Sequence, residues 1–230
     1  MKLRRSNHKN YGLTLPELVV VLFALAILIA VLLKVLDVSG RESGMRRTSA
    51  EITCVHNLKE ISLAYRIWAS DHNDLYPMGG SSTNGGMMDW TATGQAFAAS
   101  VYQVMSNELS TPKILLCPAD SDHSLTTNFL TGFSSGNISY FVGEDIANDS
   151  GIGNDSNSQR LLGGDDNFEI NGTPVKPGFL QLSTNTPLAW TSARHKFNGN
   201  VALSDGSVLE LSTARLLLYT SSTTNHLAIP

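Results

Sequence analysis

The chain contains few cysteines, few charges and only one long apolar run, and each of these shortages argues against a class of protein. Two cysteines among 230 residues are too few for a disulfide-dense scaffold or a four-cysteine zinc site. Charged residues make up 16% and the net charge is −4, so binding to nucleic acid mainly through phosphate contacts is not expected. A single apolar run also excludes a polytopic membrane protein.

The charges that are present are divided unevenly along the chain. Residues 1–12 carry four basic side chains and no acid, whereas the rest of the chain holds 12 basic and 20 acidic side chains. The apolar run follows the basic segment and is free of charge from residue 18 to residue 33. Counted from Leu13 it would form about 31 Å of helix, which matches a hydrocarbon core of about 30 Å. Basic residues before such a run predict a cytoplasmic N-terminus and a remainder outside.

Glu17 is the one acid near the start of this run, where a carboxylate is costly in a membrane and is a functional candidate for that reason. The stretch from Gly12 to Leu18 reads Gly-Leu-Thr-Leu-Pro-Glu-Leu. It resembles the signal of type IV prepilins and type II secretion pseudopilins. The resemblance implies that a prepilin peptidase cuts after Gly12 and methylates the new N-terminus at Leu13. A plain anchor and a cleavable signal peptide are the alternatives.

Buried in a filament, the Glu17 carboxylate would need a positive partner, and the N-terminal amine of a neighbouring subunit can supply one. The same resemblance therefore gives Glu17 a role in assembly. Pro16 lies beside it in the first helical turn, where its missing N–H costs nothing.

An amphipathic pattern continues beyond the apolar run. Its apolar members recur at intervals of four and three, the spacing of a single helical face: Cys54, Leu58, Ile61, Tyr65 and Trp68. We therefore expect one helix over residues 13–70, of which 13–34 is the transmembrane or assembly part. Gly40 and Gly44 are its expected weak point, since each disfavours a helix by about 1 kcal/mol relative to alanine.

Residues 1–12 are the expected leader peptide. Residues 71–230, after the long helix, are expected to form a periplasmic head of helices and strands. Apolar runs and turn signals predict helices over 95–109 and 213–219 and strands near 113–117, 138–143, 160–163, 179–183 and 187–191. The clearest hairpin has Asp205-Gly206 at its tip, because Asp-Gly suits a type I′ turn. The predicted fold class is α+β and pilin-like, with the long N-terminal helix packed on a small antiparallel sheet.

A second resemblance lies near the C-terminus. His195 is followed after nine residues by Asp205 and Gly206, a spacing similar to the C-terminal motif of one group of pseudopilin-like proteins. A catalytic role for the His195–Asp205 pair is the alternative, but no G-x-S-x-G or other nucleophile accompanies it. We therefore expect His195 and Asp205 to be structural, with Asp205 shaping the hairpin turn, and we expect no enzymatic activity.

Cys54 and Cys117 are the only cysteines. Cys54 lies on the predicted core-facing stripe, and Cys117 ends an apolar run that should pack against the same core. In a head outside the cytoplasm a disulfide would persist and would stabilise the fold by roughly 4 kcal/mol in the chain-entropy model. Two buried free thiols that act as small hydrophobic side chains are the alternative.

Acidic loops raise the question of calcium, because some major pseudopilins bind it in their heads and calcium takes six to eight oxygen ligands. The candidate ligands are Asp165, Asp166 and Asp205, although no EF-hand frame is present. The alternative is solvated loop charge. No other cofactor is expected.

The sequence thus predicts a structural subunit of a type II secretion pseudopilus or type IV pilus-like filament. Its expected partners are other pilin or pseudopilin subunits, the prepilin peptidase and the inner membrane, with no nucleic acid. The expected localisation is single-pass in the inner membrane, with the head periplasmic. The alternative function is an inner-membrane-anchored periplasmic binding protein that does not polymerise.

Overall fold

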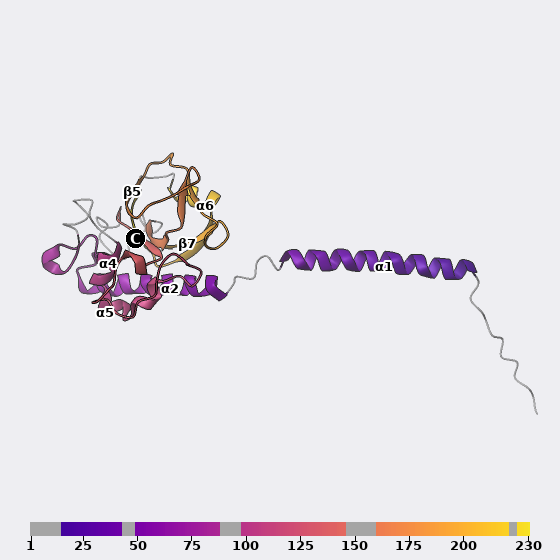
Figure 1. Ribbon diagram of the computed structural model, residues 1–230, viewed down its shortest axis with the longest axis horizontal. Coiled ribbons are helices and arrows are strands. Elements are labelled where there is room, and N and C mark those ends of the chain that lie inside the picture. The colour runs from indigo at the N-terminus through magenta and orange to yellow at the C-terminus, as the bar shows by residue number, and fades with distance from the viewer. Residues whose placement is uncertain (1–14, 43–48, 88–97, 146–159, 221–224) are drawn as a thin grey trace, which may run out of the picture. The chain divides into compact units, whose positions relative to one another are not determined.

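The computed structural model describes residues 15–42, 49–87, 98–145, 160–220 and 225–230 (Figure 1). The predicted processing residues Gly12 and Leu13 lie outside the described residues. The chain divides into two compact units, Met1–Arg47 and Thr48–Pro230. The second unit contains the amphipathic helix, the sheets and both cysteines.

The described part of the first unit is helix α1, Leu15–Glu42. Leucine, valine and alanine dominate its sequence, and Pro16 is tolerated in the first turn because the N–H groups there have no helical acceptor. Glu17, also in the first turn, is favoured by the positive end of the helix dipole. The side chains described in α1, over residues 15–29, are all exposed.

The predicted fold class is wrong in its main feature, the single long N-terminal helix. In its place the structure has two separate helices, α1 and α2 (Ser49–Asp71), beside a mostly antiparallel β architecture with short helices. The expectation rested on joining an apolar run to an amphipathic run across Gly40 and Gly44. Helix α1 continues through Gly40 to Glu42, and Gly44 lies among residues 43–48, outside the described residues.

Among the residues that the structure describes, no helix combines the length and apolar character needed to cross a membrane. This finding contradicts the predicted single-pass placement in the inner membrane with a periplasmic head. The prediction counted 21 residues from Leu13. Of those 21 residues, Leu13 and Thr14 lie outside the described residues.

The second unit contains nine strands and several short helices among its described residues. The strands are β1 Tyr140–Gly143, β2 Leu161–Asp165, β3 Phe168–Ile170, β4 Thr173–Pro174, β5 Gly178–Leu182, β6 Leu188–Trp190, β7 Asn198–Leu203, β8 Val208–Ser212 and β9 Asn225–Ile229. The shorter helices are η2 Ser82–Asn84, α4 Ala98–Val104, α5 Ser106–Leu109, η3 Pro112–Leu115, η4 Ser135–Asn137 and α6 Thr213–Thr220.

The strands form a six-stranded sheet in the order β5-β9-β1-β2-β7-β8 and a three-stranded sheet in the order β4-β3-β6. Every described pairing is antiparallel. Helix α2 lies against β2, β7 and β8, and α6 lies against β6 (Figure 1). The last strand, β9, pairs between β5 and β1 and so places the end of the chain inside the larger sheet.

Both faces of the larger sheet are buried, because successive side chains of a strand point to opposite faces. Tyr140 and Val142 belong to one core with α2, whereas Phe141 between them belongs to a second core. The predicted apolar stripe of α2, from Cys54 to Trp68, is confirmed, since all five of its side chains are buried.

Several short elements are predicted correctly and one is wrong. The hairpin around Asp205-Gly206 is β7–β8, and the helix predicted over 213–219 is α6. The turn is not type I′, because Gly206 has positive φ but Asp205 does not. The strand predicted at 113–117 is instead the 3₁₀ helix η3. Thr111 caps this helix by accepting a hydrogen bond from the Lys113 N–H, and Pro112 occupies its first turn, so the local signals favour a helical turn over extended chain.

Replacing Gly143 by alanine is expected to destabilise the second unit by about 3 kcal/mol, the upper end of the usual cost of overpacking. A Cβ at Gly143 would lie 1.8 Å from the Leu161 carbonyl oxygen, so backbone must move. At Gly136, the control, the nearest atom is the Ser134 hydroxyl oxygen at 3.6 Å. Urea unfolding measures both variants; equal stability of the two would refute this packing argument.

Candidate functional site

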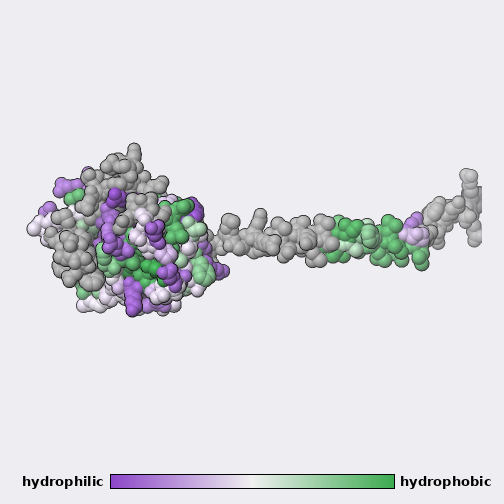
Figure 2. All heavy atoms as spheres, turned by 90° about the horizontal axis from the view of Figure 1, so that it is seen from above, coloured by the Kyte–Doolittle hydropathy of each residue, from purple (hydrophilic) through white to green (hydrophobic). Residues whose placement is uncertain are grey.

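Two features of the described chain stand out as candidate functional sites. The first is the surface of α1, where eleven large apolar side chains between Leu15 and Ile29 are at least half exposed. Figure 2 shows this part of the helix as an almost continuous hydrophobic surface. A helix that is apolar on all sides is normally buried, so this surface is a candidate contact surface.

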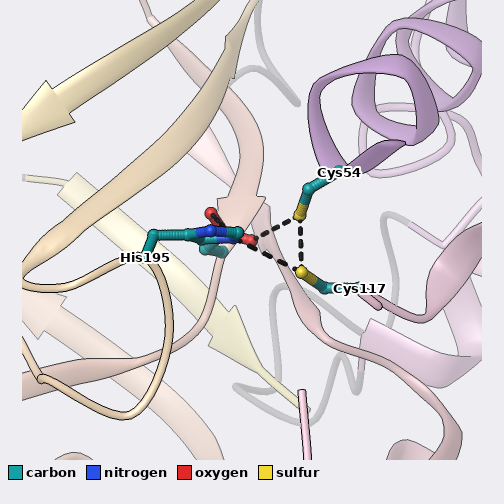
Figure 3. Close-up of side chains that lie close together, drawn as sticks. Cys54, Cys117 and His195 are labelled. Atoms are coloured by element: carbon teal, nitrogen blue, oxygen red, sulfur yellow. Dashed lines mark hydrogen bonds and ion pairs between the residues drawn. The ribbon is translucent and has the colours of Figure 1, made fainter. Parts of the chain in front are cut away.

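The second is a buried group of four side chains, Cys54, Cys117, Asp165 and His195, which we call the thiol cluster. Cys54 comes from α2 and Cys117 follows η3, whereas Asp165 ends β2 and His195 lies in the connection from β6 to β7. Figure 3 shows the two sulfurs and the imidazole pointing toward one another from separate parts of the fold. All four residues are at most 8% exposed.

The potential ligand atoms of the thiol cluster converge on one small volume, with every separation below 4.8 Å. The two sulfurs are 2.7 Å apart, and Cys54 Sγ is 3.2 Å from Asp165 Oδ1. His195 Nε2 lies 3.4 Å from Cys117 Sγ and 3.5 Å from Asp165 Oδ2. Thus a single imidazole nitrogen faces both a sulfur and a carboxylate.

This arrangement does not have the geometry of a catalytic triad. In a triad the acid holds one imidazole nitrogen while the other nitrogen faces the nucleophile. Here Asp165 and Cys117 both approach Nε2 of His195, and Nδ1 is buried with no hydrogen-bond partner among the described residues. The side chains therefore converge on a common centre and do not form a proton relay.

Neighbouring groups hold the thiol cluster in place. The backbone N–H and side-chain amide of Asn200 both donate to Asp165 Oδ2, at 2.7 and 3.0 Å. The Tyr140 hydroxyl lies 3.2 Å from Cys54 Sγ. In the β6–β7 connection, His195 and the two residues after it have φ between 46° and 63°. Three consecutive non-glycine residues in the left-handed region cost on the order of 1 kcal/mol each or more, and that strain is retained where it places the imidazole.

The titration of the cluster follows from its hydrogen bonds and burial. The hydrogen bond from Cys54 lowers the pKa of Cys117 to about 6, against the opposing effect of burial. The same hydrogen bond, together with burial, raises the pKa of the Cys54 thiol far above its usual range. Burial lowers the pKa of His195, but the Cys117 sulfur and the Asp165 carboxylate outweigh it and the net pKa is raised. One thiol is thus prepared to lose its proton.

A second polar network lies near the thiol cluster and centres on Arg194. Its guanidinium Nη2 is 2.6 Å from Asp120 Oδ2, and Nη1 donates to Asp166. Asp120 Oδ2 also accepts hydrogen bonds from the Ser139 hydroxyl at 2.6 Å and pairs with His123 Nδ1 at 2.7 Å. The Arg194 and Asp120 side chains are almost fully buried, so the network ties the chain after η3 to the β6–β7 connection.

His123, Asp166 and Arg194 of this network also line an open cavity of about 540 Å³, together with Phe168, Phe197 and Pro230. The guanidinium of Arg194 is already paired with two carboxylates. Arg194 is therefore not an available cation for an anionic ligand in this cavity.

The structure brings some of the sequence-predicted residues together and separates others. Cys54 and Cys117 are in contact, as expected, but as free thiols, so a disulfide between them stays a prediction. His195 belongs to the thiol cluster. Asp205 lies in the β7–β8 turn, where its carboxylate accepts a hydrogen bond from the Ser207 N–H at 2.8 Å and Gly206 has φ 85°.

The three predicted calcium ligands do not form one group among the described residues. Asp165 belongs to the thiol cluster and Asp166 to the Arg194 network, while Asp205 belongs to neither of the two candidate metal-binding groups. The calcium set was chosen from acidic residues in predicted loops. Asp165, however, ends a buried strand, so its carboxylate points into the core beside sulfur and not toward solvent.

Sequence reasoning missed Asp120, His123 and Arg194, and it did not connect Asp165 with the cysteines. Two short-range signals were available. Asp120 follows Cys117 by three residues, and Arg194 directly precedes His195. Asp120, Asp166 and Arg194 are therefore each within three residues of a member of the thiol cluster.

A buried carboxylate outside both clusters predicts a pH dependence of stability. Burial raises the pKa of Glu144 from 4.5 to about 7, and its Oε1 has no hydrogen-bond partner among the described residues. Because ionisation is harder in the folded state, stability should fall as pH rises from about 4.5 to about 7. Glu144→Gln should remove about 1–2 kcal/mol of this fall in urea titrations. An unchanged slope would contradict it.

A scan against protein-family models, a search of curated proteins and a search of solved structures each find no match to the chain.

Proposed function

We propose that the chain is a structural subunit of a filament of the type II secretion pseudopilus or type IV pilus-like kind. Prepilin peptidase cleaves it after Gly12 and methylates Leu13, and α1 then packs against α1 of other copies of the chain. In each copy the second unit is attached to this helical core through the chain. In this proposal the mechanism is assembly and not catalysis.

The observation that carries the proposal is the exposed apolar surface of α1. Between residues 15 and 29 every side chain is exposed and Glu17 is the only charge. Burial of apolar surface stabilises by about 25 cal/mol per Å², so covering such a helix on several sides is strongly favourable. An identical helix from another copy offers the same length and the same apolar surface.

The asymmetric sequence of α1 suits head-to-tail packing. Over residues 15–29 the single acid, Glu17, lies in the first turn, at one end of an otherwise apolar surface. A contact between different patches on successive copies does not close on itself and generates a helical filament unless the rotation closes a ring. Within such a filament the Glu17 carboxylate pairs with the N-terminal amine that cleavage after Gly12 creates on a neighbour.

Mass spectrometry of the mature N-terminus tests the processing step. The full chain is co-expressed with a prepilin peptidase, and a parallel culture lacks the peptidase. We expect a chain that begins at N-methylated Leu13 only in the first culture. An intact Met1 in both cultures, or cleavage near Ala30, would overturn the proposal and favour a chain that is not processed as a pilin.

A further inference from the structure

We propose that the thiol cluster is a binding site for a zinc-class divalent metal ion. The site would be structural, and it would join four segments of the second unit that are far apart in the sequence. This inference does not depend on whether the chain forms filaments.

The ligand types fit zinc in kind and number. The cluster offers two thiol sulfurs, one imidazole nitrogen and one carboxylate oxygen, which are the donors that zinc takes in four-coordinate structural sites. Sulfur and imidazole ligands disfavour calcium and magnesium, which require oxygen. Four protein ligands also leave no open position for a substrate or water, so the site is of the closed, structural kind.

The separations between ligand atoms fit a tetrahedron. Zinc–sulfur distances of about 2.3 Å and zinc–nitrogen or zinc–oxygen distances of about 2.0–2.1 Å place neighbouring ligands about 3.4–3.6 Å apart. Two of the contacts in the cluster fit this spacing: Cys54 Sγ is 3.2 Å from Asp165 Oδ1, and Cys117 Sγ is 3.4 Å from His195 Nε2. Only the two sulfurs, at 2.7 Å, must separate further, by about 1 Å, to reach the spacing of two zinc-bound thiolates.

The charges of the cluster favour a bound cation. Asp165 has a fully buried side chain and faces Cys54 Sγ, and both sulfurs become thiolates when a metal binds. A buried carboxylate beside thiolates is costly unless a cation is present. The imidazole of His195 would supply its neutral Nε2, the nitrogen that already faces both Cys117 and Asp165.

The surroundings of the cluster orient its ligands before any metal binds. Asn200 fixes one oxygen of Asp165 through two hydrogen bonds, and that leaves Oδ1 directed at Cys54. Second contacts of this kind are typical of metal ligands and contribute to affinity. The backbone is strained at the three left-handed residues that begin at His195. This backbone conformation directs the imidazole of His195 into the core.

Metal content and cobalt spectroscopy of the full chain test the proposal. The chain is purified with a mild detergent to cover α1 and with a reductant that keeps thiols free. We expect one zinc per chain. Replacement by Co²⁺ should give the sulfur-to-cobalt charge transfer and the intense visible bands of a tetrahedral site. Removal of the metal with a chelator should lower the melting temperature, and added zinc should restore it.

Three variants refine the test. Asp165→Asn and Cys117→Ser should each lower zinc affinity by at least about 100-fold, whereas His56→Gln, which changes an exposed histidine of α2, should leave it unchanged. If a variant does not fold, the cobalt spectrum of the unmodified chain still decides the question. Absence of bound metal at micromolar zinc, with both thiols free in denaturant, would overturn the proposal. So would a quantitative Cys54–Cys117 disulfide in the chain purified without reductant and with no metal.

Discussion

Replacing Arg194 by methionine is expected to lower the free energy of unfolding by about 3–5 kcal/mol, the usual cost of breaking a buried ion pair. The guanidinium is only 3% exposed and holds two carboxylates, Asp120 and Asp166. It also donates to the Ser139 carbonyl oxygen at 3.1 Å. Methionine retains much of the volume of arginine but leaves both carboxylates without their cation in the core.

Urea unfolding at several pH values distinguishes this electrostatic cost from a simple loss of packing. Although burial opposes it, hydrogen bonds from His123 and Ser139 and the charge of Arg194 hold the pKa of Asp120 well below its usual range. A lowered folded pKa contributes stability above about pH 4, and this is lost as pH falls through the folded value. In Arg194→Met the pKa of Asp120 should lie closer to its usual value. The loss of free energy of unfolding on acidification that is due to Asp120 should therefore be smaller in this variant.

The control for Arg194→Met is Arg215→Met, which changes an exposed arginine on α6. Surface substitutions of this kind usually change stability by no more than about 0.5 kcal/mol. A loss of less than 1 kcal/mol in Arg194→Met, or equal losses in the two variants, would show that the network is solvated and contributes little.

Glu17→Ala is expected to reduce the yield of assembled filaments by at least about tenfold. In the proposed filament this carboxylate pairs with the amine of a neighbouring subunit inside an apolar core. Loss of one partner of a buried pair costs several kcal/mol, and every 1.4 kcal/mol changes an equilibrium tenfold. The measurement is the amount of chain recovered in the sheared filament fraction, relative to the total amount of chain.

Two further variants make the Glu17 result specific. Glu60→Ala removes an exposed acid of α2 and should leave the filament yield unchanged. Glu17→Gln retains the size of the side chain but not its charge, so a yield as low as that of Glu17→Ala assigns the loss to charge. A normal yield from Glu17→Ala would rule out the assembly role of this residue.

Local patterns in the sequence predicted local elements well. The interval of four and three identified the buried face of α2 because a helix that packs on a sheet must repeat its apolar residues in this way. Asp205-Gly206 identified the β7–β8 hairpin because that dipeptide readily adopts the backbone of a tight turn. Both predictions depended on a few neighbouring residues.

The errors arose where the outcome depended on longer-range features. The single long helix was predicted across residues 43–48, which lie outside the described residues, and the membrane placement was inferred from the length of one apolar run. Cys54 and Cys117 are in contact because each lies at a core-facing position, and a disulfide between them stays a prediction. Asp165 was instead assigned to calcium, because nothing in a single sequence shows that the end of β2 pairs beside β7 and meets α2.

The thiol cluster also depends on contacts between distant parts of the sequence. Its four members are contributed by four different segments, so no sequence spacing of the C-x-x-C kind marks it. The sequence motif that contains His195 pairs it with Asp205, ten residues away. The structure gives His195 different neighbours, Cys117 and Asp165.

The measurement that tests the central claim most directly is electron cryo-microscopy of the sheared fraction from cells that express the chain with a prepilin peptidase. The account predicts helical filaments in which α1 of successive copies forms the core, with the Glu17 carboxylate near the Leu13 amine of a neighbour. A chain recovered only as monomers, or filaments in which α1 forms no contact between subunits, would contradict it.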